Sequence, residues 1–240
     1  MLRTDIAANL ARVRGQIASS AARARRDATS VRLIAVTKTF PAEIIQAAYE
    51  CGLRDFGENR VQEFVEKRSQ LDVPEARFHL IGHLQSNKVS HATAFDWVET
   101  VDSERLARRL NDAAAEAERT LQALVQVSFD DSAKQSSGRA GAPESIVPAL
   151  VASLAALGHL ELRGLMTLPP YTPDPEGARP FFRRLRELRD RLQAAGHPQL
   201  QELSMGMTHD FPIAIEEGAT MVRIGTALFG PRPAPTAVPR

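Results

Sequence analysis

The sequence predicts an α/β protein folded as a single (β/α)8 barrel of the TIM type, with an extra helix at its N-terminus. From residue 31 onward, short β-branched or apolar runs alternate with longer segments of helical period, and this unit recurs eight times. The first run is not followed by a Gly-x-Gly-x-x-Gly turn, which the alternative, a doubly wound open sheet, would favour. A chain of 240 residues is long enough to bury one sizeable core. These observations favour a closed barrel.

Eight segments are expected to form the strands of the barrel. Each is short, apolar or β-branched, and bounded by charged or turn-forming residues. They cover residues 31–37, 55–57, 77–81, 97–101, 121–128, 160–166, 202–205 and 221–224. Helical segments are expected between them. One begins at Pro41, another covers 104–118, and a third runs over 176–195 and stops at Gly196.

The N-terminal segment is expected to form an amphipathic helix over about residues 2–27. Apolar residues recur at spacings of three and four from Leu2 to Ile17, and arginines cover the other face. We interpret it as a helix that packs on the domain by its apolar stripe. The alternatives are a mitochondrial transit peptide and a basic face that contacts an anionic partner. Asp5 and Asp27 favour the packed helix, because transit peptides are poor in acidic residues.

The barrel domain is expected to cover residues 1–230. The stretch 130–143 is polar and rich in serine and glycine, so we expect a mobile loop after the fifth strand. The tail 231–240 holds four prolines and has no apolar period, which predicts disorder.

Composition and charge argue against several classes of partner. The chain is 43% hydrophobic and 25% charged, as in ordinary globular proteins. Its net charge of +1 gives no field that would attract nucleic acid. No window has the apolar length of a membrane span, and no secretory signal is present, so we expect a cytoplasmic protein without membrane contact. The only cysteine, Cys51, excludes an intramolecular disulfide.

The clearest chemical signal is Lys38, which follows the first predicted strand. Reactive groups of (β/α)8 barrels gather at the carboxyl ends of the strands. Desolvation at the mouth of an apolar site lowers the pKa of an amine, which can then add to an aldehyde as a Schiff base. The alternative is a lysine that extends from a strand end into water.

A second signal lies at the end of the last strand, in Gly225 and Thr226. A glycine and a threonine that open a short helix offer backbone amides and a hydroxyl to an anion, although a plain helix start is the alternative. Barrels often hold phosphate between the loops after strands seven and eight, where Ser204 also falls. A phosphate site beside an amine indicates a ligand with both a phosphate and an aldehyde. Pyridoxal 5′-phosphate (PLP) has both.

Six motifs in order along the chain carry a family resemblance. They are AVTK at 35–38, FGEN at 56–59, HLIGHLQSNK at 79–88, RGLM at 163–166, LSMGM at 203–207 and MVRIGT at 221–226. In these motifs, and over nearly the whole chain up to Gly230, the sequence resembles the pyridoxal-phosphate homeostasis proteins of the PROSC or YggS type.

The resemblance implies a single barrel similar to the N-terminal domain of alanine racemase. It also implies that Lys38 holds PLP as a Schiff base, that the ring lies near Asn59, and that Arg223 faces the pyridine nitrogen. Ser204, Gly225 and Thr226 would surround the phosphate. The expected cofactor-binding residues are Lys38, Asn59, Ser204, Met205, Arg223, Gly225 and Thr226.

Arg223 makes strong catalysis unexpected. Carbanion chemistry uses the protonated pyridine nitrogen of PLP as an electron sink. A guanidinium can only donate a hydrogen bond to that nitrogen and so keeps it unprotonated. A racemase also needs an acid or base on each face of its substrate, and Lys38 supplies one. We therefore favour a PLP carrier that buffers the aldehyde and passes it on to PLP-requiring apo-enzymes, as a monomer or weak dimer.

Two other functions remain as alternatives. The first is a weak PLP-dependent amino-acid racemase, with Tyr171 or His83 as the second acid or base. The second is a metal hydrolase that uses His79, His83 and His209 with Asp210, although His-x-x-x-His here spans a strand and a loop and not one face of a helix. No metal is expected in the favoured function.

Overall fold

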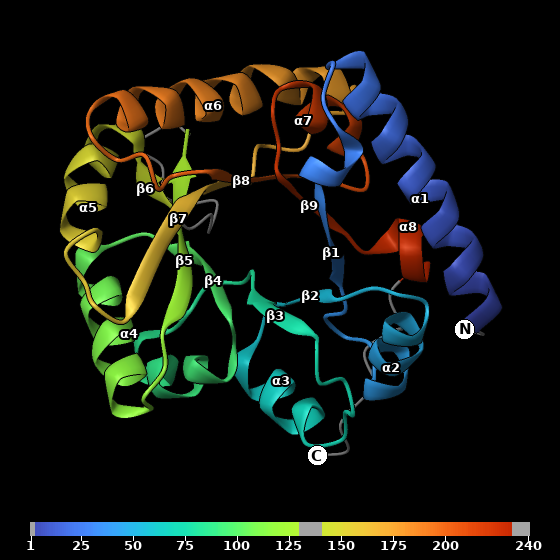
Figure 1. The fold of residues 1–240 in the computed structure, drawn as a ribbon, viewed down its shortest axis with the longest axis horizontal. Helices are drawn as coiled ribbons and strands as arrows, with labels where there is room; N and C mark the ends of the chain where they lie inside the picture. Colours follow the sequence, from blue (N-terminus) through green and yellow to red (C-terminus); the bar gives the residue numbers. More distant parts are fainter. Residues whose placement is uncertain (1–2, 130–140, 232–240) are drawn as a thin grey trace.

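The computed structural model describes residues 3–129 and 141–231, and within these ranges the strands form a ring with helices around it (Figure 1). All strand pairs are parallel. The strand order is β4-β3-β2-β1-β9-β8-β7-β5, and pairing of β4 with β5 closes the ring. The predicted (β/α)8 barrel is confirmed.

The eight barrel strands coincide with the eight predicted segments to within a few residues. They are β1 (Arg32–Val36), β2 (Asp55–Glu58), β3 (Arg77–Leu80), β4 (Trp97–Val101), β5 (Leu121–Ser128), β7 (Leu160–Thr167), β8 (Glu202–Met207) and β9 (Met221–Ile224).

One short strand was not predicted. β6 (Ala142–Pro143) pairs with Val127 and Ser128 at the end of β5, beyond the residues of β5 that pair with β4. The sequence predicted a loop over 130–143, which is wrong for these two residues, because the end of β5 offers them backbone partners. The rest of that predicted loop, 130–140, and the predicted tail from residue 232 onward lie outside the described residues.

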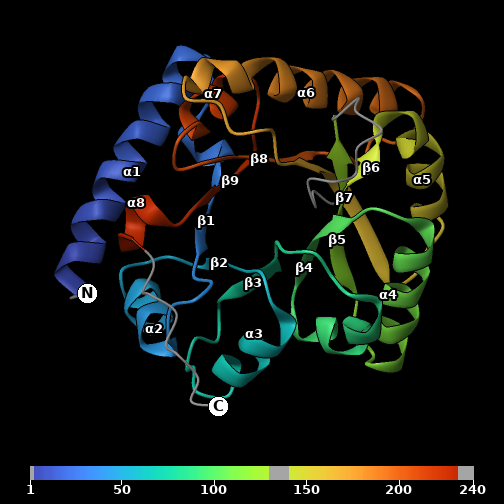
Figure 2. The same cartoon turned by 180° about the vertical axis from the view of Figure 1, so that it is seen from behind.

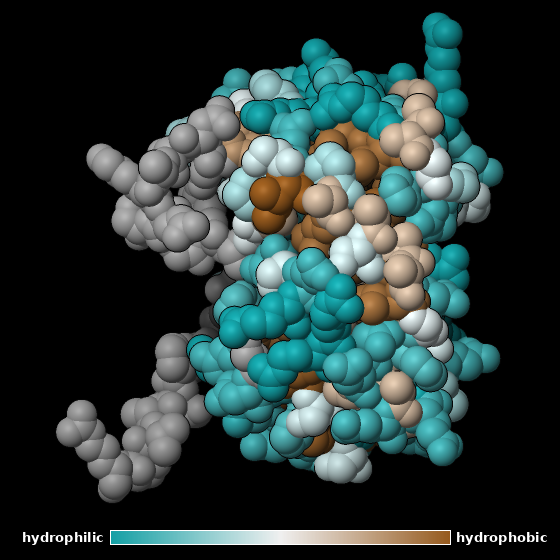
Figure 3. All heavy atoms as spheres, turned by 90° about the vertical axis from the view of Figure 1, so that its left-hand side faces the viewer, coloured by the Kyte–Doolittle hydropathy of each residue, from teal (hydrophilic) through white to brown (hydrophobic). Residues whose placement is uncertain are grey.

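The helices pack around the outside of the strands, and Figure 2 shows the same arrangement from behind. They are α1 (Arg3–Arg23), α2 (Ala42–Glu50), α3 (Val61–Arg68), α4 (Glu104–Glu116), α5 (Val147–Leu154), α6 (Arg179–Ala194), α7 (Phe211–Glu216) and α8 (Thr226–Phe229). A 3-10 segment, Ser86–Ala94, takes the helical place between β3 and β4. Hydrophilic side chains cover most of the face around α4 and α5 (Figure 3).

The N-terminal helix packs on the barrel by its apolar stripe, as the sequence predicted. Ile6, Leu10, Val13 and Ile17 are buried, and α1 lies against α2, α7 and α8. The helix ends earlier than the predicted residue 27 because Arg25 adopts a left-handed conformation, with φ of 54°. The amides around it bond back to carbonyls of the last turn, which is the usual Schellman ending of a helix.

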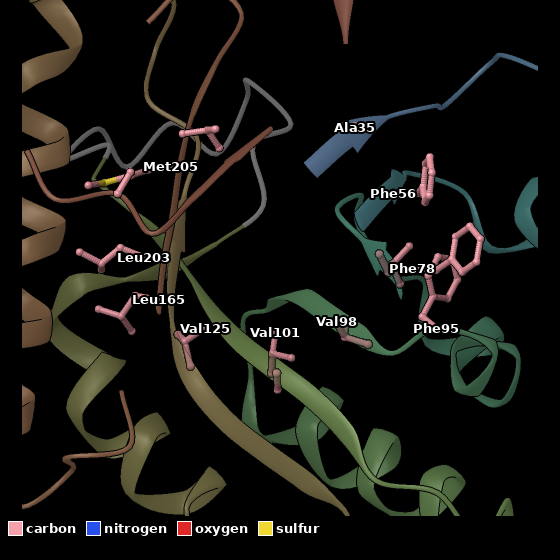
Figure 4. Close-up of a cluster of buried hydrophobic side chains, with 14 of the residues drawn as sticks. Ala35, Phe56, Phe78, Phe95, Val98, Val101, Val125, Leu165, Leu203 and Met205 are labelled. Atoms are coloured by element: carbon pink, nitrogen blue, oxygen red, sulfur yellow. The ribbon is translucent and has the colours of Figure 1, made fainter. Parts of the chain in front are cut away.

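Buried apolar side chains form two layers that follow the alternation of the strands. The outer layer lies between the strands and the helices and includes Val98, Leu165, Leu203 and Met205 (Figure 4). A smaller inner cluster contains Ile34, Trp97, Leu124, Met166 and Met221. These inner residues alternate along the strands with outer ones, so they fill the inside of the barrel.

Among the described residues, no helix combines the length and the apolar composition that crossing a bilayer requires.

Candidate functional site

A pocket of about 420 Å³ opens at the carboxyl ends of the barrel strands. Its volume lies in the range of about 300–1,000 Å³ that small-molecule sites occupy. The lining comes from the segments after β1, β3 and β7 and from the ends of β8 and β9. It includes Lys38, Thr208, His209, Arg223, Gly225 and Thr226. This is the end of the barrel where the fold places its binding loops.

Lys38 reaches this pocket from the turn that follows β1. The amide of Thr37 continues the ladder to β2 by donating to Gly57 O at 3.0 Å, and the amide of Phe40 then closes a turn on Thr37 O at 3.0 Å. Lys38 is half-buried between them. Its position at a pocket and not at an open surface fits a binding lysine better than one that extends into water.

Gly225 and Thr226 line the same pocket at the start of α8. The register pairs β1 with β9 directly, so the turn holding Lys38 and the turn holding Gly225 follow neighbouring strands. Thr208, in the loop after β8, joins them because its hydroxyl accepts a hydrogen bond from the amide of Ala227 at 3.4 Å. Prediction from sequence did not include Thr208. Its place directly after the LSMGM motif was the only available signal.

Arg223 points into the barrel from β9 and is only 3% exposed. Its Nη2 donates to Thr167 O at 2.9 Å, and its Nη1 donates to the hydroxyl of Ser204. Burial lowers the pKa of Arg223, and the charge of Glu99, whose Oε2 lies 3.9 Å from Nη1, opposes this effect. The guanidinium is therefore held in one orientation at the floor of the pocket.

Ser204 connects Arg223 to a row of buried polar groups. Its hydroxyl donates to Glu99 Oε2 at 2.5 Å, and Glu99 Oε1 lies 2.7 Å from Nδ1 of His79. Nε2 of His79 lies 3.1 Å from Asp55 Oδ1. Arg223, Ser204, Glu99, His79 and Asp55 are called the ionic row below. All five are buried, and the row runs from the pocket floor to the first residue of β2.

The charges of the ionic row support one another. Burial alone would lower the pKa of His79, but hydrogen bonds and charges from Asp55 and Glu99 outweigh it and raise this pKa. Burial alone would raise the pKa values of Asp55 and Glu99, but the contact with His79 leaves both lowered. The imidazolium form of His79 between two carboxylates satisfies all three groups. Its ring also stacks on Trp97, with centroids 5.3 Å apart.

Asn59 follows β2 and lies in a neighbouring groove of about 490 Å³, together with His83. Its Oδ1 is buried and has no hydrogen-bond partner among the described residues. The backbone of Asn59 packs so tightly on Gly82 that a Cβ at position 82 would lie 2.2 Å from Asn59 O. A buried acceptor without a partner in the protein is costly, which fits a residue that binds a ligand.

Three of the predicted cofactor residues do not line the pocket, and the first of them, Asn59, lies in the neighbouring groove. Ser204 is fully buried in the ionic row. The side chain of Met205 packs in the outer apolar layer, because neighbouring residues of a strand face opposite sides (Figure 4). Lys38, Arg223, Gly225 and Thr226 all line the pocket.

The candidate acid–base and metal residues are dispersed. Tyr171 is 76% exposed and does not line the pocket, although its ring lies 5.3 Å from that of His209. His79 is inside the barrel, His83 is in the neighbouring groove, and His209 is at the pocket. Within residues 3–129 and 141–231, no group of three or more His, Cys, Asp or Glu residues is arranged to hold a metal ion.

The fold and the pocket define the class of protein. A sequence profile described as the N-terminal domain of alanine racemase matches residues 9–233. An alanine racemase of Clostridium difficile 630 shares this fold, with a TM-score of 0.65 at 15% identity over 86% of this chain and 53% of that chain.

Closer relatives narrow the class. A pyridoxal phosphate homeostasis protein of Aquifex aeolicus is 41% identical over 224 residues, which are 93% of this chain and 96% of that protein. One from Pseudomonas aeruginosa is 42% identical and covers 95% of this chain and 96% of its own. PipY of Synechococcus elongatus, solved with PLP bound, has a TM-score of 0.83 at 39% identity, over 94% of this chain and 100% of that chain. The chain belongs to the family of pyridoxal phosphate homeostasis proteins, which confirms the resemblance in the sequence motifs.

Proposed function

We propose that this protein binds PLP in the pocket at Lys38 and holds it for delivery to other proteins. The observation that carries the proposal is that Lys38, Arg223 and Thr226, from opposite ends of the sequence, line one pocket. The amine, the guanidinium and the hydroxyl match the aldehyde, the ring nitrogen and the phosphate of the cofactor. The relative PipY, solved with PLP bound, supports the same assignment.

In this proposal the residues have distinct roles. The amine of Lys38 would hold the aldehyde as a Schiff base, with loss of water. Arg223 would donate a hydrogen bond to the ring nitrogen from the orientation that Ser204 helps to fix. Gly225, Thr226 and Thr208 hold the phosphate, and Asn59 with its unpartnered Oδ1 lies near the ring. Met205 supports Ser204 from the outer layer and does not contact the cofactor.

PLP, when bound, supplies an electron sink to enzymes that protonate its ring nitrogen. Arg223 cannot accept a proton, so it holds that nitrogen unprotonated and limits this chemistry. An arginine at that nitrogen favours a carrier over an enzyme. The family name given to the relatives is consistent with a role in homeostasis.

The proposal includes PLP-requiring apo-enzymes as recipients, a cytoplasmic location and a monomer or weak dimer. It also keeps residues 1–230 as one domain, without nucleic-acid or membrane partners. These remain predictions from the sequence.

Trapping with borohydride tests the proposal. The purified protein is mixed with PLP, its absorbance spectrum is recorded, and borohydride is added before peptide mass spectrometry. We expect a reduced PLP adduct on Lys38 that Lys38→Ala lacks and that Lys88→Ala, in the neighbouring groove, retains. An unlabelled wild-type protein, or a labelled site elsewhere that persists in Lys38→Ala, would refute the proposal.

A weak racemase is the second candidate, because His209 lines the same pocket as Lys38 and lies beside Tyr171. Chiral chromatography after long incubation of PLP-loaded protein with amino acids tests it. Turnover above that of free PLP, lost in both Lys38→Ala and His209→Ala, would establish an enzyme. For a carrier we expect no turnover above that of free PLP.

A further inference from the structure

Two carboxylates hold the residues on either side of Lys38. The hydroxyl of Thr37 donates to Glu58 Oε1 at 2.8 Å, and the amide of Thr39 donates to Glu63 Oε1 at 2.8 Å. Glu58 is the last residue of β2 and is fully buried, whereas Glu63 lies on α3. The backbone that carries Lys38 is therefore fixed on both sides by side chains from other elements.

One ammonium group joins these two carboxylates. Nζ of Lys67, on α3, lies 3.1 and 3.2 Å from the two oxygens of Glu58 and 2.6 Å from Glu63 Oε1. It also donates to Thr37 O at 3.3 Å. The Lys67 side chain is only 10% exposed. Its position links both carboxylates and the strand end directly to one another.

The turn that Lys67 supports has an unfavourable backbone conformation. Thr39 has φ of 69°, in the left-handed region that β-branched residues rarely adopt. Such a conformation persists only where surrounding contacts fix it. The hydrogen bond from the Thr39 amide to Glu63 is one such contact, and Lys67 orients that carboxylate.

The charge of Lys67 favours the ionised form of Glu58. Burial raises the pKa of Glu58, and the charge of Lys67 is the largest influence that opposes the increase. Without the ammonium, Glu58 would take up a proton more easily and would accept hydrogen bonds less strongly. The bond from Thr37 would then weaken as well.

We propose that Lys67 is a positioning residue for Lys38: by joining Glu58 to Glu63, it fixes the turn from which the Lys38 amine enters the pocket and so sets how readily that amine reacts with an aldehyde. This inference rests on the proposed function, because it assigns a reacting amine to Lys38. It goes further by assigning the control of that amine to a residue outside the pocket lining.

The charged groups around the Lys38 turn define what an experiment must control. Arg223 and His209 face the pocket from β9 and from the loop after β8, and Glu58, Glu63 and Lys67 support the turn from β2 and α3. A change at Lys67 leaves Arg223 and His209 in place. An altered reactivity of Lys38 in such a variant therefore reports on the support of the turn.

The first measurement needs no cofactor. In the ligand-free protein, competitive acetylation by acetic anhydride over a range of pH values, mapped by mass spectrometry, gives the reactivity profile of the Lys38 amine. We expect Lys67→Met to shift this profile and to reduce the rate of acetylation of Lys38 several-fold. Lys67→Arg should restore most of the wild-type behaviour, and Lys88→Met, in the neighbouring groove, should leave the profile unchanged.

The second measurement uses PLP and borohydride. We expect the rate of trapping on Lys38 to fall by about tenfold in Lys67→Met, which corresponds to about 1.4 kcal/mol in the barrier. Glu63→Gln, at a quarter-exposed carboxylate, should show a smaller reduction, and it tests the inference even where Lys67→Met does not fold.

Different results separate the two proposals. The folded variants could show the wild-type trapping rate and the wild-type acetylation profile of Lys38, even with a lower melting temperature. This result would show that Lys67 only stabilises the fold and would overturn this inference. A wild-type protein that borohydride and PLP fail to label would instead overturn the proposed function, whereas the acetylation profile would still report on the effect of Lys67.

Discussion

The imidazole of His79 lies 2.7 Å from the carboxylate of Glu99, and both side chains are fully buried inside the barrel. Apolar layers usually fill this space in (β/α)8 barrels. Here the inner apolar cluster shares it with the ionic row, in which Ser204 and Glu99 support Arg223 at the pocket floor. The stability of the barrel and the geometry of the site are therefore coupled through the same buried charges.

Stability should fall at alkaline pH because of His79. Its raised pKa means that the folded protein keeps a proton which the unfolded chain releases above about pH 6.5. The contribution of His79 to the free energy of unfolding is therefore complete below that pH and is lost as pH rises through the raised value. Urea unfolding at several pH values should show a smaller alkaline loss in His79→Gln than in wild type.

An exposed histidine gives the control for this measurement. His91 lies on the surface, and His91→Gln should follow the wild-type dependence on pH. An equal alkaline loss in His79→Gln and wild type would mean that His79 is not charged in the folded protein.

Arg223 and Glu99 should depend on each other. Glu99→Gln leaves the buried guanidinium without its nearest carboxylate, and we expect it to cost about 3–5 kcal/mol of the free energy of unfolding. The double variant Glu99→Gln with Arg223→Met should lose less than the sum of the two single variants, with a coupling of about 0.5–3 kcal/mol. Additive losses in urea unfolding would contradict a direct interaction.

Thr226 should recognise the phosphate and no other part of the ligand. We expect Thr226→Val to weaken PLP binding by about ten- to a hundredfold, because a hydrogen bond to a charged group contributes about 1.5–3 kcal/mol. Binding of pyridoxal, which has the aldehyde and no phosphate, should stay at its wild-type level. Titration of both ligands, followed by absorbance, makes the comparison. Equal losses for the two ligands would place Thr226 elsewhere in the site.

Gly82 should be indispensable for the loop that holds Asn59. A Cβ at position 82 meets the Asn59 backbone at 2.2 Å, so Gly82→Ala must displace one of the two loops. We expect a lower melting temperature and weaker PLP binding. Gly15→Ala is the matched control, since Gly15 lies on the exposed face of α1 with open space around it, and should stabilise the protein by about 0.5–1 kcal/mol. Unchanged PLP binding in Gly82→Ala would show that the position of Asn59 does not matter for PLP binding.

The alternation of short apolar runs with helical segments was sufficient to predict the barrel and the central part of the pocket. Each strand is a distinct apolar run, and the barrel rule then places Lys38 and Gly225 at the same end. The alternation of side chains along a strand could also have shown that Ser204 and Met205 do not both face the inside of the barrel, because adjacent residues on a strand face opposite sides. Both were assigned to the cofactor, and Met205 packs outward.

Interactions across the barrel could not be predicted in this way. Glu99 and His79 lie within runs that predict strands, and nothing in their local sequence shows that they meet each other or that Glu99 lies beside Arg223. Lys67 stands in a polar stretch of α3 that predicts a solvent-exposed lysine. Only the closed ring and the packing of α3 bring these charges together, and both depend on contacts between distant parts of the chain.

The pairing of β1 with β9 also has a consequence for synthesis. The first and last strands of the ring become neighbours only when the sheet closes, and they carry Lys38 and Arg223 into one pocket. The pocket can therefore form only after β9 has left the ribosome. A chain whose translation stops before β9 has no complete site, however much of the barrel precedes it.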